Sequence, residues 1–120
     1  MYCLVVDDSK VVRKICCDIV ESLGFTTGQA EDGKIALEQC YKKIPDLILL
    51  DWNMPVMTGI EFLEQFRQLP GAEKTKVIFC TTENGLANIQ QALSTGADEY
   101  VMKPFDKAII EGKLQQVGLI

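Results

Sequence analysis

The sequence predicts an α/β fold in which helices cover both faces of a parallel sheet. Short, solidly apolar runs alternate with longer segments whose apolar residues recur at helical spacing, and this pair repeats five times in 120 residues. Strands that alternate with helices build parallel sheets, and strands buried on both faces are continuously apolar. A chain of this length forms one core. We therefore expect a single domain over residues 1–120, with no output domain attached.

Four of the expected strands are the apolar runs at residues 3–6, 47–50, 77–80 and 100–102. Residues 25–30 (FTTGQA) form the least apolar candidate, so we place this strand at an edge and the three richest at the centre. With right-handed crossovers, this placement favours the order 2-1-3-4-5, which is the doubly wound, flavodoxin-like (βα)5 arrangement. Its crevice lies beyond the carboxyl ends of strands 1 and 3.

The expected helices have start and stop signals. The first should begin after Ser9, which can cap it, and end near Gly24. A second fits residues 33–43, because Pro45 forces the chain out of a helix. Thr58 can cap a third. Apolar residues at helical spacing give the first, third, fourth and fifth helices one apolar face each. In the first helix these residues are Val12, Ile15, Cys16, Ile19, Val20 and Leu23, and in the third they are Phe62, Leu63, Phe66 and Leu69. In the fourth helix they are Leu86, Ile89 and Leu93, and in the fifth they are Ile110, Leu114 and Val117.

The composition argues against several classes of function. With 12 basic and 17 acidic residues, a net charge of −5 and no basic cluster, the sequence offers no surface for nucleic acid. No segment has the pattern of a membrane span or, at the start, of a signal peptide. The chain has no histidine, and its five cysteines follow no metal-ligand spacing, which argues against a zinc site. Each cysteine lies in an apolar run, so we expect buried thiols in a reducing cytoplasm.

Polar residues follow the expected strands. Asp7 and Asp8 come after the first strand, Asp51 after the third, Thr81 after the fourth and Lys103 after the fifth. Because the carboxyl ends of parallel strands lie at one edge, these side chains should meet there. Each also has an ordinary interpretation: Asp7 or Asp8 could cap the first helix, Thr81 could simply leave its strand, and Lys103 could be a solvated lysine.

Three converging carboxylates need a cation. Two like charges ~4 Å apart repel by about 1 kcal/mol in water and by several times that near a protein surface. Hard oxygen ligands at an open cleft suit Mg²⁺. A carboxylate beside Mg²⁺ can attack phosphorus and form an aspartyl phosphate. Asp51 is the best candidate nucleophile, Asp7 and Asp8 are candidate metal holders, and Lys103 with a threonine hydroxyl could neutralise the phosphoryl oxygens.

Four segments, VVDDS, LLDWNMPVMTG, CTTEN and YVMKPF, together resemble the receiver domains of two-component response regulators, the CheY-like superfamily. The resemblance spans the whole chain, with the motifs in the right order and spacing. It implies a switch that accepts a phosphoryl group on Asp51 from a histidine kinase, a histidine phosphotransfer protein or a small phosphodonor. Such a domain catalyses only its own phosphorylation and dephosphorylation and does not act as an enzyme on other substrates. Its cofactor would be Mg²⁺ or Mn²⁺.

The resemblance also implies a role for each matching residue. Asp8 and Asp51 would be side-chain ligands of Mg²⁺, with Asn53 adding its backbone carbonyl and Asp7 acting through a metal-bound water. Thr81 and Lys103 would bind the phosphoryl oxygens.

Further matches concern the switch and its lifetime. Tyr100 matches the aromatic switch residue. Its ring would move when the Thr81 side chain moves, and this would repack the face formed by the fourth helix, fifth strand and fifth helix, where a downstream protein binds. The Lys103–Pro104 bond is typically cis in this family. Asn53 and Glu83 resemble the pair found in receivers with short-lived phosphoryl groups. Thr82 departs from the alanine or serine of many relatives, and its β-branched bulk could restrain Tyr100.

Other functions fit the sequence less well. Mg²⁺-dependent phosphatases and phosphotransferases of the haloacid-dehalogenase type carry a D-x-D motif after strand 1 and need a cap domain. This chain has Asp-Asp-Ser at that position and no room for a cap. Flavodoxin-type electron transfer needs a phosphate-binding loop where DDSK stands. A non-phosphorylated pseudo-receiver scaffold remains a third hypothesis. We expect a single-domain, cytoplasmic bacterial protein, monomeric or dimerising on phosphorylation, without nucleic-acid or membrane partners.

Overall fold

One parallel sheet organises the structure, a computed structural model that describes residues 1–82 and 86–120. Within these residues the strand order is β2-β1-β3-β4-β5, as predicted. The strands are β1 (Tyr2–Val6), β2 (Thr26–Ala30), β3 (Leu47–Asp51), β4 (Lys76–Thr81) and β5 (Glu99–Met102). The helices are α1 (Lys10–Ser22), α2 (Gly33–Lys42), α3 (Gly59–Phe66), α4 (Leu86–Thr95) and α5 (Lys107–Gln116), with a short 3₁₀ helix η1 (Ala72–Lys74) before β4.

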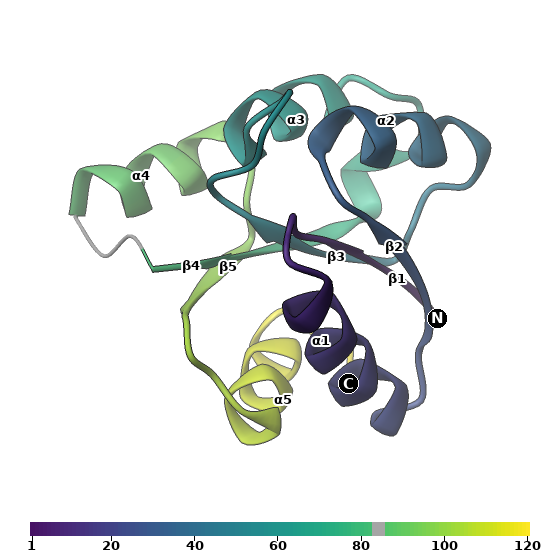
Figure 1. Cartoon of the computed structure of the whole chain (residues 1–120), viewed down its shortest axis with the longest axis vertical. Helices are drawn as coiled ribbons and strands as arrows, with labels where there is room; N and C mark the ends of the chain where they lie inside the picture. The colour runs from purple at the N-terminus through teal and green to yellow at the C-terminus, as the bar shows by residue number, and fades with distance from the viewer. Residues whose placement is uncertain (83–85) are drawn as a thin grey trace.

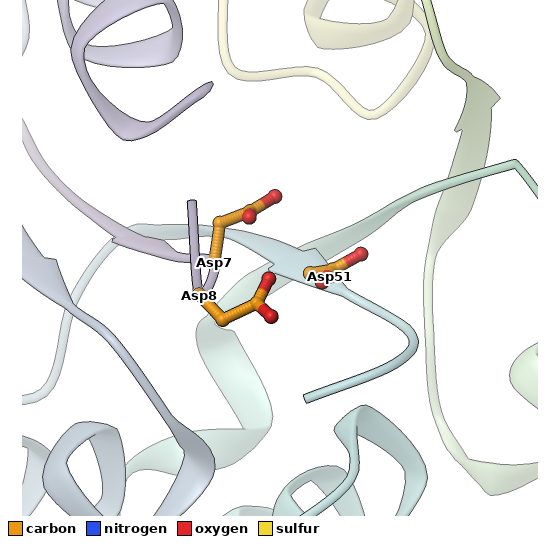
Figure 2. Close-up of side chains that lie close together, drawn as sticks. All are labelled: Asp7, Asp8 and Asp51. Carbon is orange, nitrogen blue, oxygen red and sulfur yellow. The ribbon is translucent and has the colours of Figure 1, made fainter. Parts of the chain in front are cut away.

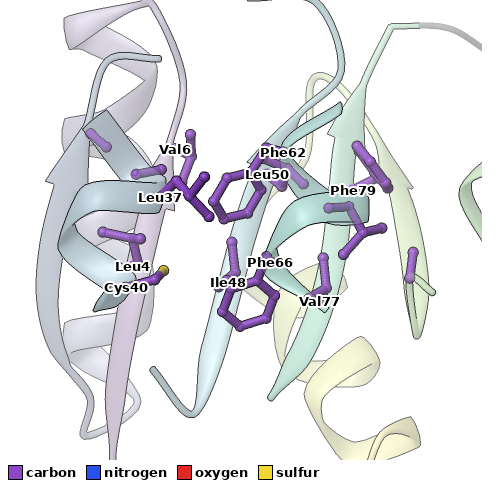
Figure 3. Close-up of a cluster of buried hydrophobic side chains, with 14 of the residues drawn as sticks. Leu4, Val6, Leu37, Cys40, Ile48, Leu50, Phe62, Phe66, Val77 and Phe79 are labelled. Atoms are coloured by element: carbon purple, nitrogen blue, oxygen red, sulfur yellow. The ribbon is translucent and has the colours of Figure 1, made fainter. Parts of the chain in front are cut away.

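The sheet has helices on both faces (Figure 1): α2, α3 and α4 lie on one side, and α1 and α5 lie on the other. Alternate residues of each central strand point to opposite faces. Ile48 and Leu50 of β3 therefore enter the core under α2 and α3 (Figure 3), whereas Leu47 and Leu49 enter the core under α1 and α5. All five residues of β3 are buried, which explains its unbroken apolar run.

The helix starts agree with the predicted caps. The Ser9 hydroxyl accepts the Val12 N–H of α1. Thr58 and Glu61 form a capping box in which each side chain accepts the other's backbone N–H, so two otherwise unpaired donors are satisfied. Gly24, just past α1, has φ +98°, a conformation that glycine adopts without steric cost.

Three details of the predicted helices are wrong. The third helix ends at Phe66 and does not extend to Leu69, which lies in a turn directly before Pro70, where helical conformation is disfavoured. In α4, Ala92 is buried, whereas the predicted core residue Leu93 is 46% exposed. In α1 the predicted core residue Ile15 is 49% exposed, whereas the predicted residues Cys16 and Val20 are buried together with Cys17.

The cysteines are buried, as the sequence predicted. All five are free thiols. Burial raises the pKa of the Cys16 and Cys40 thiols to about 12, so these groups stay protonated at neutral pH. Within residues 1–82 and 86–120, no helix has both the length and the apolar character that crossing a bilayer requires.

Candidate functional site

Strand register brings the acidic residues together at one edge of the sheet. Val6 of β1 pairs with Leu50 of β3, so the residues that follow, Asp7 and Asp51, come out of the sheet at the same level. Figure 2 shows their carboxylates beside that of Asp8, and one carboxylate oxygen from each lies within 4.8 Å of the others. Asp7 and Asp51 are only 3% and 8% exposed, whereas Asp8 is exposed to solvent.

Lys103 supplies the positive charge between the two buried carboxylates. Its Nζ lies 2.6 Å from Asp7 Oδ2 and 3.1 Å from Asp51 Oδ1. The sequence thus correctly predicted that Asp7, Asp8, Asp51 and Lys103 would meet. With all four groups ionised, three negative charges against one positive leave two uncompensated negative charges.

Burial and the neighbouring charges together shift the pKa values of Asp51 and Lys103. Burial raises the pKa of the Asp51 carboxyl, and the charge of Asp7 raises it further, while Lys103 opposes the change. For Lys103, burial acts to lower the pKa, but the hydrogen bond to Asp7 and the charge of Asp51 outweigh burial and raise it. Lys103 therefore stays protonated, and Asp51 holds its negative charge at a cost.

Asp7 is fixed by local backbone contacts. Its Oδ1 accepts a hydrogen bond from the Ser9 N–H at 2.8 Å, and its backbone carbonyl accepts one from Nη1 of Arg13 at 2.8 Å. Ser9, not Asp7 or Asp8, provides the cap of α1, which settles the alternative interpretation of these aspartates. Sequence reasoning missed Arg13, because a contact from a helix side chain to a backbone carbonyl leaves no pattern in the sequence.

The loop after Asp51 packs closely against the strand. A Cβ at Gly59 would collide with the Asp51 backbone carbonyl and the Phe79 ring, so this position accepts only glycine. The Gly59 N–H donates to the Trp52 carbonyl at 3.1 Å, and the half-buried Trp52 ring lies 5.1 Å from the Phe79 ring. The loop thereby holds Asp51 at the tip of β3.

The other predicted residues lie around this group. Thr81 is buried at the end of β4, Asn53 is exposed in the loop after β3, and the half-buried Tyr100 lies on β5. Thr81 and Tyr100 line one narrow hollow together with Trp52, Phe79, Asn88, Ile89 and Ala92. The Lys103–Pro104 bond is cis. Glu83 lies outside the described residues.

The donor set fits a small hard cation. Asp7, Asp8 and Asp51 offer carboxylate oxygens that converge within 4.8 Å, and the exposed Asp8 leaves one side of the group open to solvent. Mg²⁺ prefers oxygen ligands, takes only one or two carboxylates from a protein and keeps several waters. A divalent cation would also cancel the two excess negative charges.

Comparison with known proteins agrees with this geometry. The model of the response regulator receiver domain family matches residues 3–115. The chain belongs to this family. The chemotaxis protein CheY of Pseudomonas aeruginosa is 35% identical over 118 residues, which cover 98% of this chain and 95% of that protein. The structure of chemotaxis protein CheY4 of Vibrio cholerae has a TM-score of 0.91 and 34% identity, and the match covers 97% of each chain.

Receiver domains also occur within longer relatives. The phosphate regulon transcriptional regulatory protein PhoB of Escherichia coli is 33% identical over 114 residues, and the chain spans 50% of its length. The relatives therefore include proteins of similar length and proteins in which the receiver domain is one part. In both cases the chain is similar to a receiver domain of two-component signalling.

Proposed function

We propose that this receiver domain is a phosphorylation-activated switch whose phosphoryl acceptor is Asp51. The observation that carries the proposal is the position of its carboxylate, 3.1 Å from Lys103 Nζ and within a group of three converging carboxylates. A buried carboxylate that pairs with a cation beside a prospective metal site is arranged to attack phosphorus. Among the three aspartates, only Asp51 belongs to a central strand and is held by a packed loop on its far side.

The transfer itself requires few groups. An Asp51 oxygen forms a bond to phosphorus while the bond from phosphorus to the donor nitrogen of a phosphohistidine breaks, and that nitrogen keeps the electron pair. Lys103 contacts Asp51 before transfer and can then bind an equatorial phosphoryl oxygen, with the Thr81 hydroxyl binding another. Phosphoryl transfer depends mainly on such positioning and charge neutralisation.

A divalent cation held by these residues would complete the charge balance. Asp8 and Asp51 would hold Mg²⁺, or Mn²⁺, through their side chains, Asn53 through its backbone carbonyl and Asp7 through a bound water. When bound, the cation supplies further neutralisation of the phosphoryl oxygens. The convergence of oxygen donors and the excess negative charge support this assignment.

The switch connects the site to a protein-binding face. Attraction of the Thr81 hydroxyl to the phosphoryl group would widen the hollow between Thr81 and Tyr100, so that the Tyr100 ring could enter it. This movement would repack the face formed by α4, β5 and α5, where a downstream protein would bind. Asn53 and Glu83, two positions beyond Asp51 and Thr81, would set how fast the phosphoryl group is hydrolysed.

The biological setting follows from the same proposal. The phosphodonor would be a histidine kinase or a histidine phosphotransfer protein in the bacterial cytoplasm, and the domain would act as a monomer or as a phosphorylation-dependent dimer. The domain would turn over no substrate other than its own phosphoryl group. A scaffold that is never phosphorylated is the competing proposal, and the Asp51–Lys103 geometry argues against it.

Intact mass spectrometry tests the proposal. The wild type, incubated with acetyl phosphate and Mg²⁺, should gain one phosphoryl group, and neither Asp51→Asn nor a sample with EDTA should gain any. Asp18→Asn is the matched control, because it makes the same exchange at an exposed position of α1 and should be phosphorylated like the wild type. Failure of the wild type to gain mass from either acetyl phosphate or a phosphorylated histidine phosphotransfer protein would favour the scaffold.

A further inference from the structure

Glu99 of the edge strand β5 forms an ion pair with Lys113 of α5, and neither residue belongs to the two apolar cores. Because β5 ends the sheet, side chains of α5 can reach around it toward the α4 side. Tyr100 packs with the core under α3 and α4, whereas Val101 packs with the core that includes Ile110 and Leu114 of α5. A residue of α5 that contacts Tyr100 therefore bridges the two faces of the sheet.

Lys113 of α5 makes this bridge. Its Nζ lies 3.3 Å from Glu99 Oε1 and 5.9 Å from the centre of the Tyr100 ring. The same Glu99 oxygen accepts the Tyr100 backbone N–H at 3.0 Å. The Lys113 and Glu99 side chains are each 25% exposed, so the pair is partly withdrawn from water. One carboxylate thus holds both the backbone of Tyr100 and the cation near its ring.

We propose that Lys113, held by Glu99, is a positioning residue that retains the Tyr100 ring in its half-buried resting position. This inference rests on the proposed phosphorylation switch and identifies what opposes it. A cation within about 6 Å of an aromatic ring is attracted to the ring's face. When the ring moves into the hollow beside Thr81, it leaves this cation, so the contact favours the resting state. The pair thereby sets how easily phosphorylation moves Tyr100.

Loss of the cation should increase the population of the inward state. A cation–π contact at a partly exposed site changes an equilibrium by about two- to fivefold. Lys113→Met keeps the length and much of the apolar stem of the side chain while removing the charge. Lys113→Arg keeps the charge and should keep the population of the resting Tyr100 position at its wild-type level. A role of Lys113 in packing alone would not require the charge.

Fluorine NMR on the full chain tests this inference. The three tyrosines are replaced with 3-fluorotyrosine, and Tyr100→Phe identifies the Tyr100 resonance by its disappearance. Saturation with Mg²⁺ and beryllofluoride, an analogue of the phosphoryl group, defines the activated position. Without the analogue, Lys113→Met should move the Tyr100 resonance toward that position, corresponding to an about two- to fivefold rise in the inward population. Glu99→Gln should shift it in the same direction.

The controls separate the possible outcomes. Lys107→Met removes a lysine from an exposed position of the same helix and should leave the resonance where the wild type has it. A wild type whose Tyr100 resonance ignores beryllofluoride, and which gains no phosphoryl mass, would overturn the proposed function. A responsive wild type with unchanged resting resonances in both Lys113→Met and Glu99→Gln would overturn the role of Lys113 alone. An equal shift in Lys113→Arg and Lys113→Met would also contradict it.

Discussion

Val56, in the loop that follows Asp51, has a backbone conformation that suits its side chain poorly. Its φ is +70°, in the left-handed region, and its side chain is 75% exposed. A left-handed conformation costs an L-residue about 1 to 2 kcal/mol, and β-branched residues are rarely found there. The side chain gains little from packing in return, so this residue reduces the stability of the fold.

Val56→Asn should raise the free energy of unfolding by about 1 kcal/mol, because asparagine enters the left-handed region more readily than other non-glycine residues. Chemical denaturation of the two proteins measures the difference. Val11→Asn, the same exchange at a 69% exposed position of α1, should change it by less than about 0.5 kcal/mol. A variant at Val56 that is no more stable than the wild type would show that the loop carries no strain.

For single residues, the sequence is informative where the chemistry depends on the ends of strands. Asp51 and Lys103 could be placed together because each follows an apolar run that had to be buried. The left-handed backbone of Val56 could not be predicted, because valine favours extended conformations and gives no turn signal. The partners of Lys113 were missed for another reason, since its contacts depend on how α5 packs beside the edge strand.

Among the contacts between elements, those of Arg67 connect the segments at the amino ends of β4 and β5, opposite the site. Its Nη1 donates to the carbonyls of Ala72 and Thr75 at 2.7 and 2.8 Å. Its Nε and Nη2 donate to the carbonyl of Gly96, and Nη2 also pairs with Asp98 at 3.0 Å. One side chain thus joins the end of α3, the turn before β4 and the turn between α4 and β5.

Arg67→Met should lower the free energy of unfolding by about 2 to 4 kcal/mol, because several partly buried carbonyls and the Asp98 carboxylate lose a charged donor. Urea denaturation gives this value. The comparison is Lys14→Met, which removes an ion pair whose side chains are 76% and 61% exposed and should cost less than about 0.5 kcal/mol. Equal effects of the two substitutions would show that Arg67 acts as an ordinary surface cation.

The elements were predictable to the extent that apolar pattern decides them. The strand order followed from ranking strands by apolar content, and β2 lies at an edge as its polar sequence indicated. Leu93 was mispredicted as part of the buried face of α4 because the buried Ala92 contributes little to a hydrophobic pattern. The length of α3 depended on a turn that Leu69 enters before Pro70.

For the whole molecule, the concentrated negative charge of the site links stability to pH and to divalent cations. The folded state raises the pKa of Asp51, so it binds this proton more tightly than the unfolded chain does. The resulting stabilisation is present at low pH and is lost as pH rises from the ordinary carboxyl range through the raised pKa. Asparagine cannot ionise and avoids this loss.

Asp51→Asn should therefore be more stable than the wild type at neutral pH in EDTA, and the difference should shrink as pH falls through the raised pKa of Asp51. Mg²⁺ should stabilise the wild type by about 1.4 kcal/mol at ten times its Kd and the variant by less. Thermal melts across pH, with and without Mg²⁺, measure both effects. A stability difference that is independent of pH, or equal Mg²⁺ stabilisation of both proteins, would contradict this electrostatic account.

The position of the phosphoryl group tests most directly whether Asp51 is the acceptor. Borohydride reduces an acyl phosphate to an alcohol but leaves ordinary carboxylates intact, so a phosphorylated aspartate becomes homoserine. After treatment of the wild type with acetyl phosphate and Mg²⁺, peptide sequencing by tandem mass spectrometry should find homoserine at position 51 alone. Homoserine at Asp7 or Asp8, or none in a sample whose intact mass has increased, would contradict the assignment of Asp51 as the acceptor.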